Sequence, residues 1–294
     1  MKNFILHISL CFLSFLVPVG SCLAQDEDDQ EPTVRLVYHS SLVGVGLYSV
    51  RDTYLSPFEY TGKGVRIVDE RMRMTGCLDG KVSTQQLINI DFSSSKNLME
   101  TASNYTLMLD YSYGAHYHFR PLPKLRMLTG AQANLHLGAI YNTRNGNNPV
   151  SAKAGLNLNL SGIADYQFKI KQQPVSIRYQ GDWSLVGGVF SPHYGQSYYE
   201  ISLGNHDGLV RFTHPGNQLF LKNYLTVEVP VRFCTMRLTY LNSIYQTNVS
   251  ALKTQIRSNT IMIGIVKEIF SMPAKKPIGK TMNGVNYRRV YDDD

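Results

Sequence analysis

The chain has 294 residues, and it contains no long apolar segment after Gln25. A transmembrane helix needs about 20 consecutive apolar residues, so the sequence predicts that no helix beyond this point crosses a membrane. Only four cysteines are present, and two of them, Cys11 and Cys22, lie before Gln25. The other two, Cys77 and Cys234, are hypothesised to form a disulfide, and two isolated thiols are the alternative, because sequence spacing alone cannot decide between them.

Motifs that bind nucleotides or structural zinc are also missing. The sequence has no P-loop, no zinc-finger spacing and no dinucleotide fingerprint. The formal net charge is +7, but the basic residues form no dense cluster of the kind that binds nucleic acid. We therefore expect no cofactor and no nucleic-acid partner, and we attribute the charge to basic residues that face a lumen or an anionic lipid surface.

The N-terminus has the features of an export signal, predicted to span residues 1–24. Lys2 is the positive region, residues 4–19 are apolar, and Cys22-Leu23-Ala24 precede a cleavage site before Gln25. A retained membrane anchor is one alternative. A second is lipidation of Cys22, because residues 19–22 (VGSC) resemble a lipobox. Residues 25–40 are predicted to be an acidic linker.

The sequence is rich in segments whose apolar residues alternate with polar ones, and the longest spans residues 124–141 (KLRMLTGAQANLHLGAIY). Its apolar set runs from Leu125 to Tyr141, and the intervening set is largely polar with glycines. Alternation with a period of two indicates a strand. Soluble strands average about 5–6 residues, so a strand this long, apolar on one face and polar on the other, is typical of a transmembrane barrel. The 19 tyrosines suit its aromatic girdles.

The same pattern recurs along the chain and predicts ten clear strands. The four other regular segments are residues 106–119, 151–161, 175–185 and 218–229. Five less regular segments are residues 41–53, 63–74, 82–93, 235–246 and 255–270, and a phase slip at Val68-Asp69 predicts a bulge. We therefore expect an all-β fold: a single antiparallel transmembrane β-barrel at residues 41–270, an up-and-down meander followed by a periplasmic tail at 271–294.

The connections between these segments are predicted to alternate in length, as short periplasmic turns and longer external loops do. The predicted turns are residues 75–81, 120–123, 171–174 and 230–234. The long loop 191–217 contains segments 197–203 and 209–213 around Gly204-Asn205-His206-Asp207-Gly208, which suggests a hairpin. Counting that hairpin gives the preferred number of about 12 strands, with 10 as the alternative.

Three segments resemble a known family. They are residues 54–62 (YLSPFEYTG), 190–200 (FSPHYGQSYYE) and 263–267 (IGIVK). Together they resemble a family of uncharacterised outer-membrane barrel proteins from Gram-negative anaerobes. The resemblance supports a barrel in the outer membrane, and it implies no catalytic residue.

The polar face of the predicted strands supplies the candidate lumen residues. Two histidines of one strand and one of the next could bind a metal, but no close set of ligands completes a site, so a hydrogen-bonded lumen network is favoured. Interleaved charges, which include Asp91, Lys153, Lys222 and Glu228, are expected to pair across a narrow lumen. The lumen or ligand candidates are Asp110, His116, His118, Arg126, His136, Arg178, Asp182 and Arg237.

The loop between residues 190 and 214 supplies a second set, because loops often carry function. A surface hairpin with girdle tyrosines is the alternative interpretation. The external-loop candidates are His193, Tyr194, Tyr198, Tyr199, Glu200, His206 and His214.

The predicted function is non-enzymatic: a monomeric barrel that is a narrow porin-like channel or binds a small molecule or lipid. Arg126, Arg178 and Arg237 would favour anions in an open path. The expected partners are outer-membrane lipids and, during assembly, the barrel-insertion machinery. One alternative is a lipid hydrolase at the barrel rim, which would need a serine activated by a histidine on the wall. Another is a lipid-anchored binding protein with a smaller β-fold.

Overall fold

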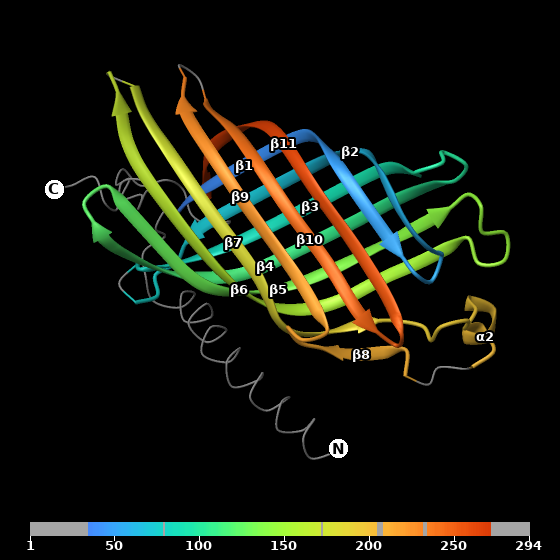
Figure 1. The fold of residues 1–294 in the computed structure, drawn as a ribbon. Coiled ribbons are helices and arrows are strands. Elements are labelled where there is room, and N and C mark those ends of the chain that lie inside the picture. The colour runs from blue at the N-terminus through green and yellow to red at the C-terminus, as the bar shows by residue number, and fades with distance from the viewer. Residues whose placement is uncertain (1–34, 79, 172, 205–207, 232–233, 272–294) are drawn as a thin grey trace, which may run out of the picture.

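The chain forms a closed antiparallel β-barrel (Figure 1). The computed structural model describes residues 35–78, 80–171, 173–204, 208–231 and 234–271. The predicted signal peptide and the predicted C-terminal tail beyond Ser271 lie outside these residues. Each strand of the barrel pairs with its neighbours in the chain, and β1 closes the barrel against β11.

Eleven strands and one short helix make up the described structure. They are β1 (Arg35–Asp52), β2 (Ser56–Met74), β3 (Val82–Asn97), β4 (Ser103–Leu122), β5 (Leu125–Asn142), β6 (Val150–Ile170), β7 (Gln173–Phe190), α2 (Tyr198–Ser202), β8 (Val210–Thr213), β9 (Gln218–Pro230), β10 (Thr235–Val249) and β11 (Leu252–Ser271).

Ten strands form the wall, and β8 is an addition to its rim. β7 pairs with β9 from Ser176 to Trp183, and its last residues, Gly187 to Phe190, pair with β8 instead. The described structure therefore has the predicted meander with the alternative count of ten strands, and the preferred count of twelve is wrong.

The predicted hairpin fails because its first half is helical. Ser197 caps α2 by accepting a hydrogen bond from the backbone of Glu200, and the Glu200 side chain accepts one from the Ser197 backbone. This reciprocal capping box satisfies the first free amide groups of a helix. The local Ser-x-x-Glu spacing thus outweighs the alternating pattern of residues 197–203.

The strands are longer than the patterns predicted, so the connections are shorter. β1 begins at Arg35, inside the predicted linker, and only residues 53–55 separate it from β2. Residues 250–251 alone join β10 to β11, both with positive φ, at 54° and 60°. The predicted alternation of long and short connections is therefore not strict, because strand pairing continues past the apolar part of each strand.

The two ends of the barrel differ. We call the end where β1 starts and β11 finishes the terminal end, and the opposite one the loop end. The loop end carries α2, β8 and the connection 191–217, and it lies at the right in Figure 1.

Inward residues are buried and outward residues are exposed along each strand. In β2 the inward series includes Met72, Glu70, Val68 and Arg66, so apolar and charged residues alternate along its inward face. This alternation on the inward face explains why the apolar pattern of the sequence changes phase at residues 68–69. The register of β2 with both neighbours is continuous there, so the predicted bulge is absent.

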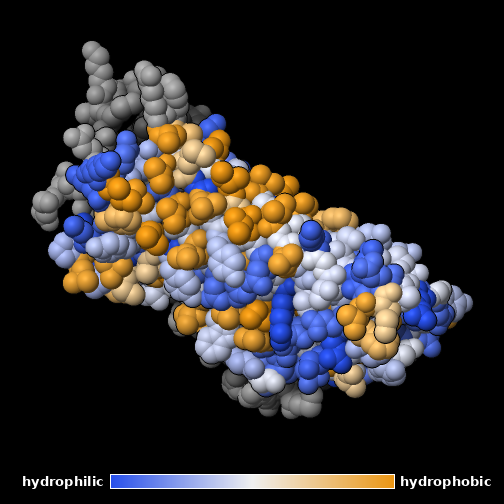
Figure 2. Space-filling model, turned by 45° about the horizontal axis from the view of Figure 1, so that its top comes forward, coloured by the Kyte–Doolittle hydropathy of each residue, from blue (hydrophilic) through white to orange (hydrophobic). Residues whose placement is uncertain are grey.

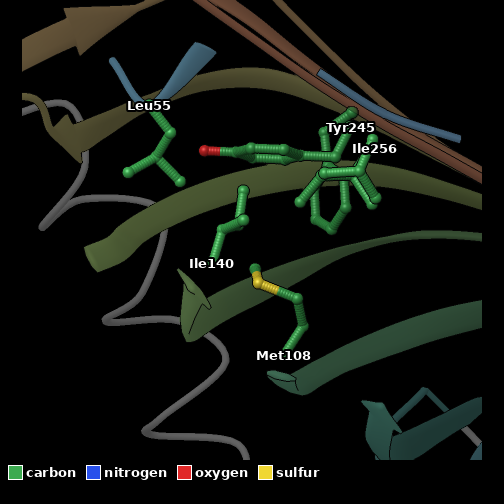
Figure 3. Close-up of a cluster of buried hydrophobic side chains, with 7 residues drawn as sticks. Leu55, Met108, Ile140, Tyr245 and Ile256 are labelled. Atoms are coloured by element: carbon green, nitrogen blue, oxygen red, sulfur yellow. The ribbon is translucent and has the colours of Figure 1, made fainter. Parts of the chain in front are cut away.

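The lumen is filled by three apolar clusters. The terminal cluster consists of Tyr38, Met72, Met74, Leu128, Ile163 and Val266. The middle cluster consists of Leu42, Val68, Leu87, Tyr224, Leu241 and Met262. The loop cluster consists of Val50, Leu55, Met108, Ile140, Phe220, Tyr245 and Ile256. Figure 3 shows side chains of the loop cluster pointing toward one another inside the barrel.

The outer wall is apolar over much of its area, and Figure 2 shows such side chains gathered on one face, with hydrophilic ones toward the right-hand end. Stacked aromatic pairs lie near both ends: Tyr105 with Tyr141 near the loop end, and Tyr166 with Phe168 near the terminal end. Two aromatic girdles around an apolar band are typical of barrels that span a membrane.

Candidate functional site

A group of charged residues lies between the terminal and middle clusters. Glu70 accepts hydrogen bonds from Nη2 of Arg178 at 2.6 Å and from Nη1 of Arg237 at 2.5 Å. Arg237 also donates from Nε to Glu228 at 2.9 Å. All four side chains are buried. Because a buried charge is costly unless it is paired, these residues are held by one another, and we call them the Glu70 network.

Two further layers of ion pairs lie toward the loop end. Arg66 Nη2 is 3.0 Å from Asp91 Oδ2, and Lys222 Nζ is 3.2 Å from Asp110 Oδ2. Nearer the loop end, Lys153 Nζ lies 2.7 Å from Asp52 Oδ2.

The other predicted lumen charges are also buried and paired. Arg126 forms an ion pair with Asp165 near the terminal end. Asp182 accepts a hydrogen bond from the Ser161 hydroxyl at 2.6 Å and others from the Gln180 amide. Arg126, Arg178 and Arg237 therefore each face a carboxylate, and they do not present a row of free positive charge.

The three predicted lumen histidines are buried and separately bonded. His116 bonds to Ser161 at 2.9 Å, and His118 bonds to Ser83 at 2.7 Å. His136 is 3.2 Å from the Tyr245 hydroxyl, and a Cβ on the facing Gly155 would come within 2.4 Å of its ring. Within the described ranges no three His, Cys, Asp or Glu residues form a group that could hold a metal.

Two small cavities lie among the described lumen residues, each of about 20 Å³. One is lined by members of the Glu70 network and the middle cluster, and the other by Arg66, Asp91 and the loop cluster. A space of this size holds a water molecule or two, so neither cavity admits an organic ligand.

Two tyrosines at the loop end connect the loop that contains α2 to the barrel. Tyr54 donates its hydroxyl proton to the backbone oxygen of Gln196 at 2.9 Å, and its ring packs edge-on against Tyr198 at 5.8 Å. The Tyr198 hydroxyl accepts a hydrogen bond from the Ala152 amide at 2.6 Å. Burial and the neighbouring Tyr198 raise the pKa of Tyr54 to about 12, and burial also raises the pKa of Tyr198. These contacts hold the loop that contains α2 onto the rim.

The remaining loop candidates do not converge. His193 bonds to Nη2 of Arg211 at 3.2 Å, whereas Tyr194 and Tyr199 are exposed and Glu200 caps α2. His214 accepts a hydrogen bond from the Gly216 amide in its own turn. His206 lies outside the described residues. The loop is therefore not organised as a pocket by these side chains.

The hypothesised Cys77–Cys234 disulfide is not formed, because Cys234 carries a free thiol. Both residues lie in connections at the terminal end, but the strands that carry them, β2 and β10, are separated by β1 and β11. Three steps of about 4.8 Å each exceed the Cα separation of about 7 Å that a disulfide spans.

One polar group on the outer wall was not predicted. His39 Nε2 lies 2.7 Å from Asp69 Oδ2, and the Ser41 hydroxyl donates to the same oxygen at 2.8 Å. The alternating pattern predicted a first strand that begins at residue 41, and so it did not show that His39 and Ser41 share an outward face. The signal was the spacing of two between them, at the end of an alternating segment.

No helix within the described part of the chain is long and apolar enough to cross a membrane.

Solved structures similar to the chain are distant. The translocator domain of the autotransporter NalP from Neisseria meningitidis is 8% identical, with 87% of this chain and 96% of that chain covered and a TM-score of 0.37. The transport unit of the autotransporter AIDA-I from Escherichia coli is 9% identical, with 84% and 92% covered and a TM-score of 0.47. The outer membrane protease OmpT from Escherichia coli is 7% identical, with 83% and 99% covered and a TM-score of 0.36. Such similarities carry no information on activity.

No curated protein matches the chain. A family model does match, over residues 8–276, and its description is "Protein of unknown function". The match covers most of the sequence and confirms the resemblance to a family without an established activity. The chain belongs to this family, DUF3316.

Proposed function

We propose that this protein is an integral outer-membrane barrel whose lumen is closed to solutes and whose function is exercised on lipid at its outer wall. The observation that carries the proposal is the filled lumen. Three apolar clusters and the ion pairs between them occupy it, and the two cavities found among its described residues each measure only about 20 Å³.

The charge pairing supports a closed lumen over a porin-like one. A conducting path needs side chains that water and ions can reach. Arg178 and Arg237 are instead buried, and both form ion pairs with the carboxylate of Glu70. Separating such pairs leaves uncompensated charges in a region of low dielectric constant, which costs about 3–5 kcal/mol for each broken pair. The network therefore resists opening.

The outer wall supports a lipid partner. On β4 the outward residues from Tyr105 to Phe119 are almost all apolar or aromatic. On β2 only Val65 and Ile67 are apolar between the outward Lys63 and Asp69. The apolar band is therefore much shorter over β1 and β2, and polar side chains there lie at the level of lipid headgroups.

Single-channel recording in a planar bilayer tests the closed lumen. The refolded chain is reconstituted, and insertion is verified by protection of the barrel from added protease. Inserted protein without discrete current steps supports the proposal. Reproducible steps would overturn it and favour the porin-like channel, whose ion selectivity could then be measured with Arg178→Glu and Arg237→Glu.

A further inference from the structure

A cluster of polar residues faces outward where the apolar band over β1 and β2 ends toward the terminal end. We call it the boundary cluster: His39, Ser41, Asp69 and Arg71. In the register of the sheet, Ser41 stands opposite Asp69, and His39 stands opposite Arg71 on one side and Lys267 of β11 on the other. The next outward residues toward the loop end are the exposed Val43 and Ile67.

Asp69 is the centre of the cluster. Its Oδ2 is bonded to His39 Nε2 at 2.7 Å and accepts from the Ser41 hydroxyl at 2.8 Å, and its Oδ1 is 3.4 Å from Arg71 Nε. The His39 and Asp69 side chains are only 22% and 27% exposed. A carboxylate bonded to one ring nitrogen fixes the tautomer of a histidine, so Nε2 carries the proton and Nδ1 carries the lone pair. Nδ1 has no hydrogen-bond partner among the described residues.

We propose that the boundary cluster hydrolyses the acyl esters of phospholipids. This inference rests on the proposed function, because it needs lipid as the substrate at the outer wall. His39 is the general base: its Nδ1 takes a proton from a water molecule, whose oxygen attacks the ester carbonyl carbon. The tetrahedral intermediate then expels the glycerol oxygen, which receives that proton from His39. The products are a fatty acid and a lysophospholipid, and no oxidant or other co-reactant is consumed.

The surroundings select a phospholipid. Arg71, Arg73 and Lys267 are exposed cations at the cluster, and among the described side chains Asp69 is the only acidic one bonded to any of them. Cations of this kind bind phosphate. The apolar residues Val43, Ile67 and Ile265 lie directly beside the cluster and suit acyl chains. An ester bond joins these two parts of a phospholipid, at the level where the apolar wall meets the polar one.

The residues of the boundary cluster have different roles in the proposed reaction, and variants can distinguish these roles. His39 would touch the reacting water, whereas Asp69 and Ser41 act through it as positioning residues. A general base contributes about 10²–10⁴-fold to a rate. We therefore expect His39→Gln to lower the rate at least about 100-fold, and His214→Gln, which changes an exposed loop histidine, to leave it unchanged.

The experiment uses chain refolded from denatured protein, which removes co-purifying lipases, in vesicles of phosphatidylethanolamine and phosphatidylglycerol. Mass spectrometry follows the release of fatty acid and lysophospholipid. Release by the wild type and by His214→Gln, with loss in His39→Gln, supports the proposal. A folded wild type that releases no lysophospholipid, or a His39→Gln variant as fast as the wild type, overturns it.

Conservative variants test the positioning roles. Asp69→Asn should lose activity and Asp69→Glu should recover part of it, since a carboxylate still reaches Nε2. Ser41→Ala should cost only a few-fold, and Ser41→Thr should restore that loss. Abolished activity in Ser41→Ala, together with covalent labelling of Ser41 by a fluorophosphonate, would overturn the water step and make Ser41 the nucleophile.

The two proposals fail separately. If the inserted protein shows no current steps and releases no fatty acid, the closed lumen is supported and the hydrolytic site is ruled out. If the protein conducts ions and also hydrolyses lipid, the hydrolytic site is supported and the closed lumen is ruled out.

Discussion

Oε1 of Glu70 on β2 lies 2.6 Å from Nη2 of Arg178 on β7, although 108 positions separate the two residues in the chain. The pair spans the lumen, because β2 and β7 are not neighbours in the sheet. It links opposite walls of the barrel at a level where the Arg237 side chain joins from β10.

Glu70→Gln should destabilise the barrel strongly. The change leaves two buried arginines without their shared carboxylate, and breaking a buried ion pair in this way costs about 3–5 kcal/mol. The free energy of unfolding is measured by urea titration in lipid vesicles, followed by Trp183 fluorescence. Glu100→Gln is the matched control, since Glu100 is exposed and, among the described residues, pairs only with the exposed Lys96. Equal unfolding midpoints for the two variants would contradict the role of the network.

The loop contact of Tyr54 should depend on pH at high pH only. Because the pKa of Tyr54 rises from 10.0 to about 12 in the folded protein, the folded state favours the protonated phenol. Its contribution to docking of the loop is complete below pH 10 and is lost as the pH rises through about 12. The difference in tyrosinate absorbance between the wild type and Tyr54→Phe should titrate with a midpoint of about 12. A midpoint near the ordinary value of about 10 would show that Tyr54 is not held in this way.

Trp183 provides a reporter of lipid contact because it is the single tryptophan of the chain. Its side chain faces outward on β7 and is 42% exposed. We expect brominated acyl chains to quench its fluorescence strongly. In a Trp183→Phe background, Phe220→Trp moves the indole into the loop cluster, where quenching should be weak. Similar quenching at both positions would mean that lipid does not line the wall as proposed.

The free thiol of Cys234 tests the orientation of the barrel. If the terminal end is periplasmic, a membrane-impermeant maleimide should not label Cys234 in intact cells and should label it after the outer membrane is permeabilised. Leu203→Cys in a Cys234→Ser background places a thiol at the loop end, where Leu203 is 70% exposed. That variant should react in intact cells, and the reverse pattern of labelling would invert the proposed topology.

The barrel could be predicted from sequence because its outward residues make one face of most strands apolar. The segment from Leu125 to Tyr141 shows this most clearly, and the structure has β5 there within one residue at each end. Strand ends were harder to predict, since rim residues such as His39 of β1 and Lys267 of β11 still pair although their side chains are polar.

The candidate site was less predictable. The lumen position of Arg178 follows from alternation, but its bond to Glu70 depends on how the closed barrel brings β2 and β7 face to face. Glu70 itself was missed because the apolar phase of β2 changes beside it. His39 was missed for a similar reason, as it lies on strand residues that precede the regular pattern.

The pairing of β1 with β11, which closes the barrel, has a consequence for biogenesis. All 18 residues of β1 pair with β11, from Arg35 opposite Ser271 to Asp52 opposite Thr254. These contacts join the two ends of the described chain and have the largest sequence separation of any strand pair, and such contacts form slowly. The first strand must therefore wait, with one edge exposed, until synthesis of the last strand is complete. An unpaired strand edge of this kind is a template for aggregation until the barrel closes.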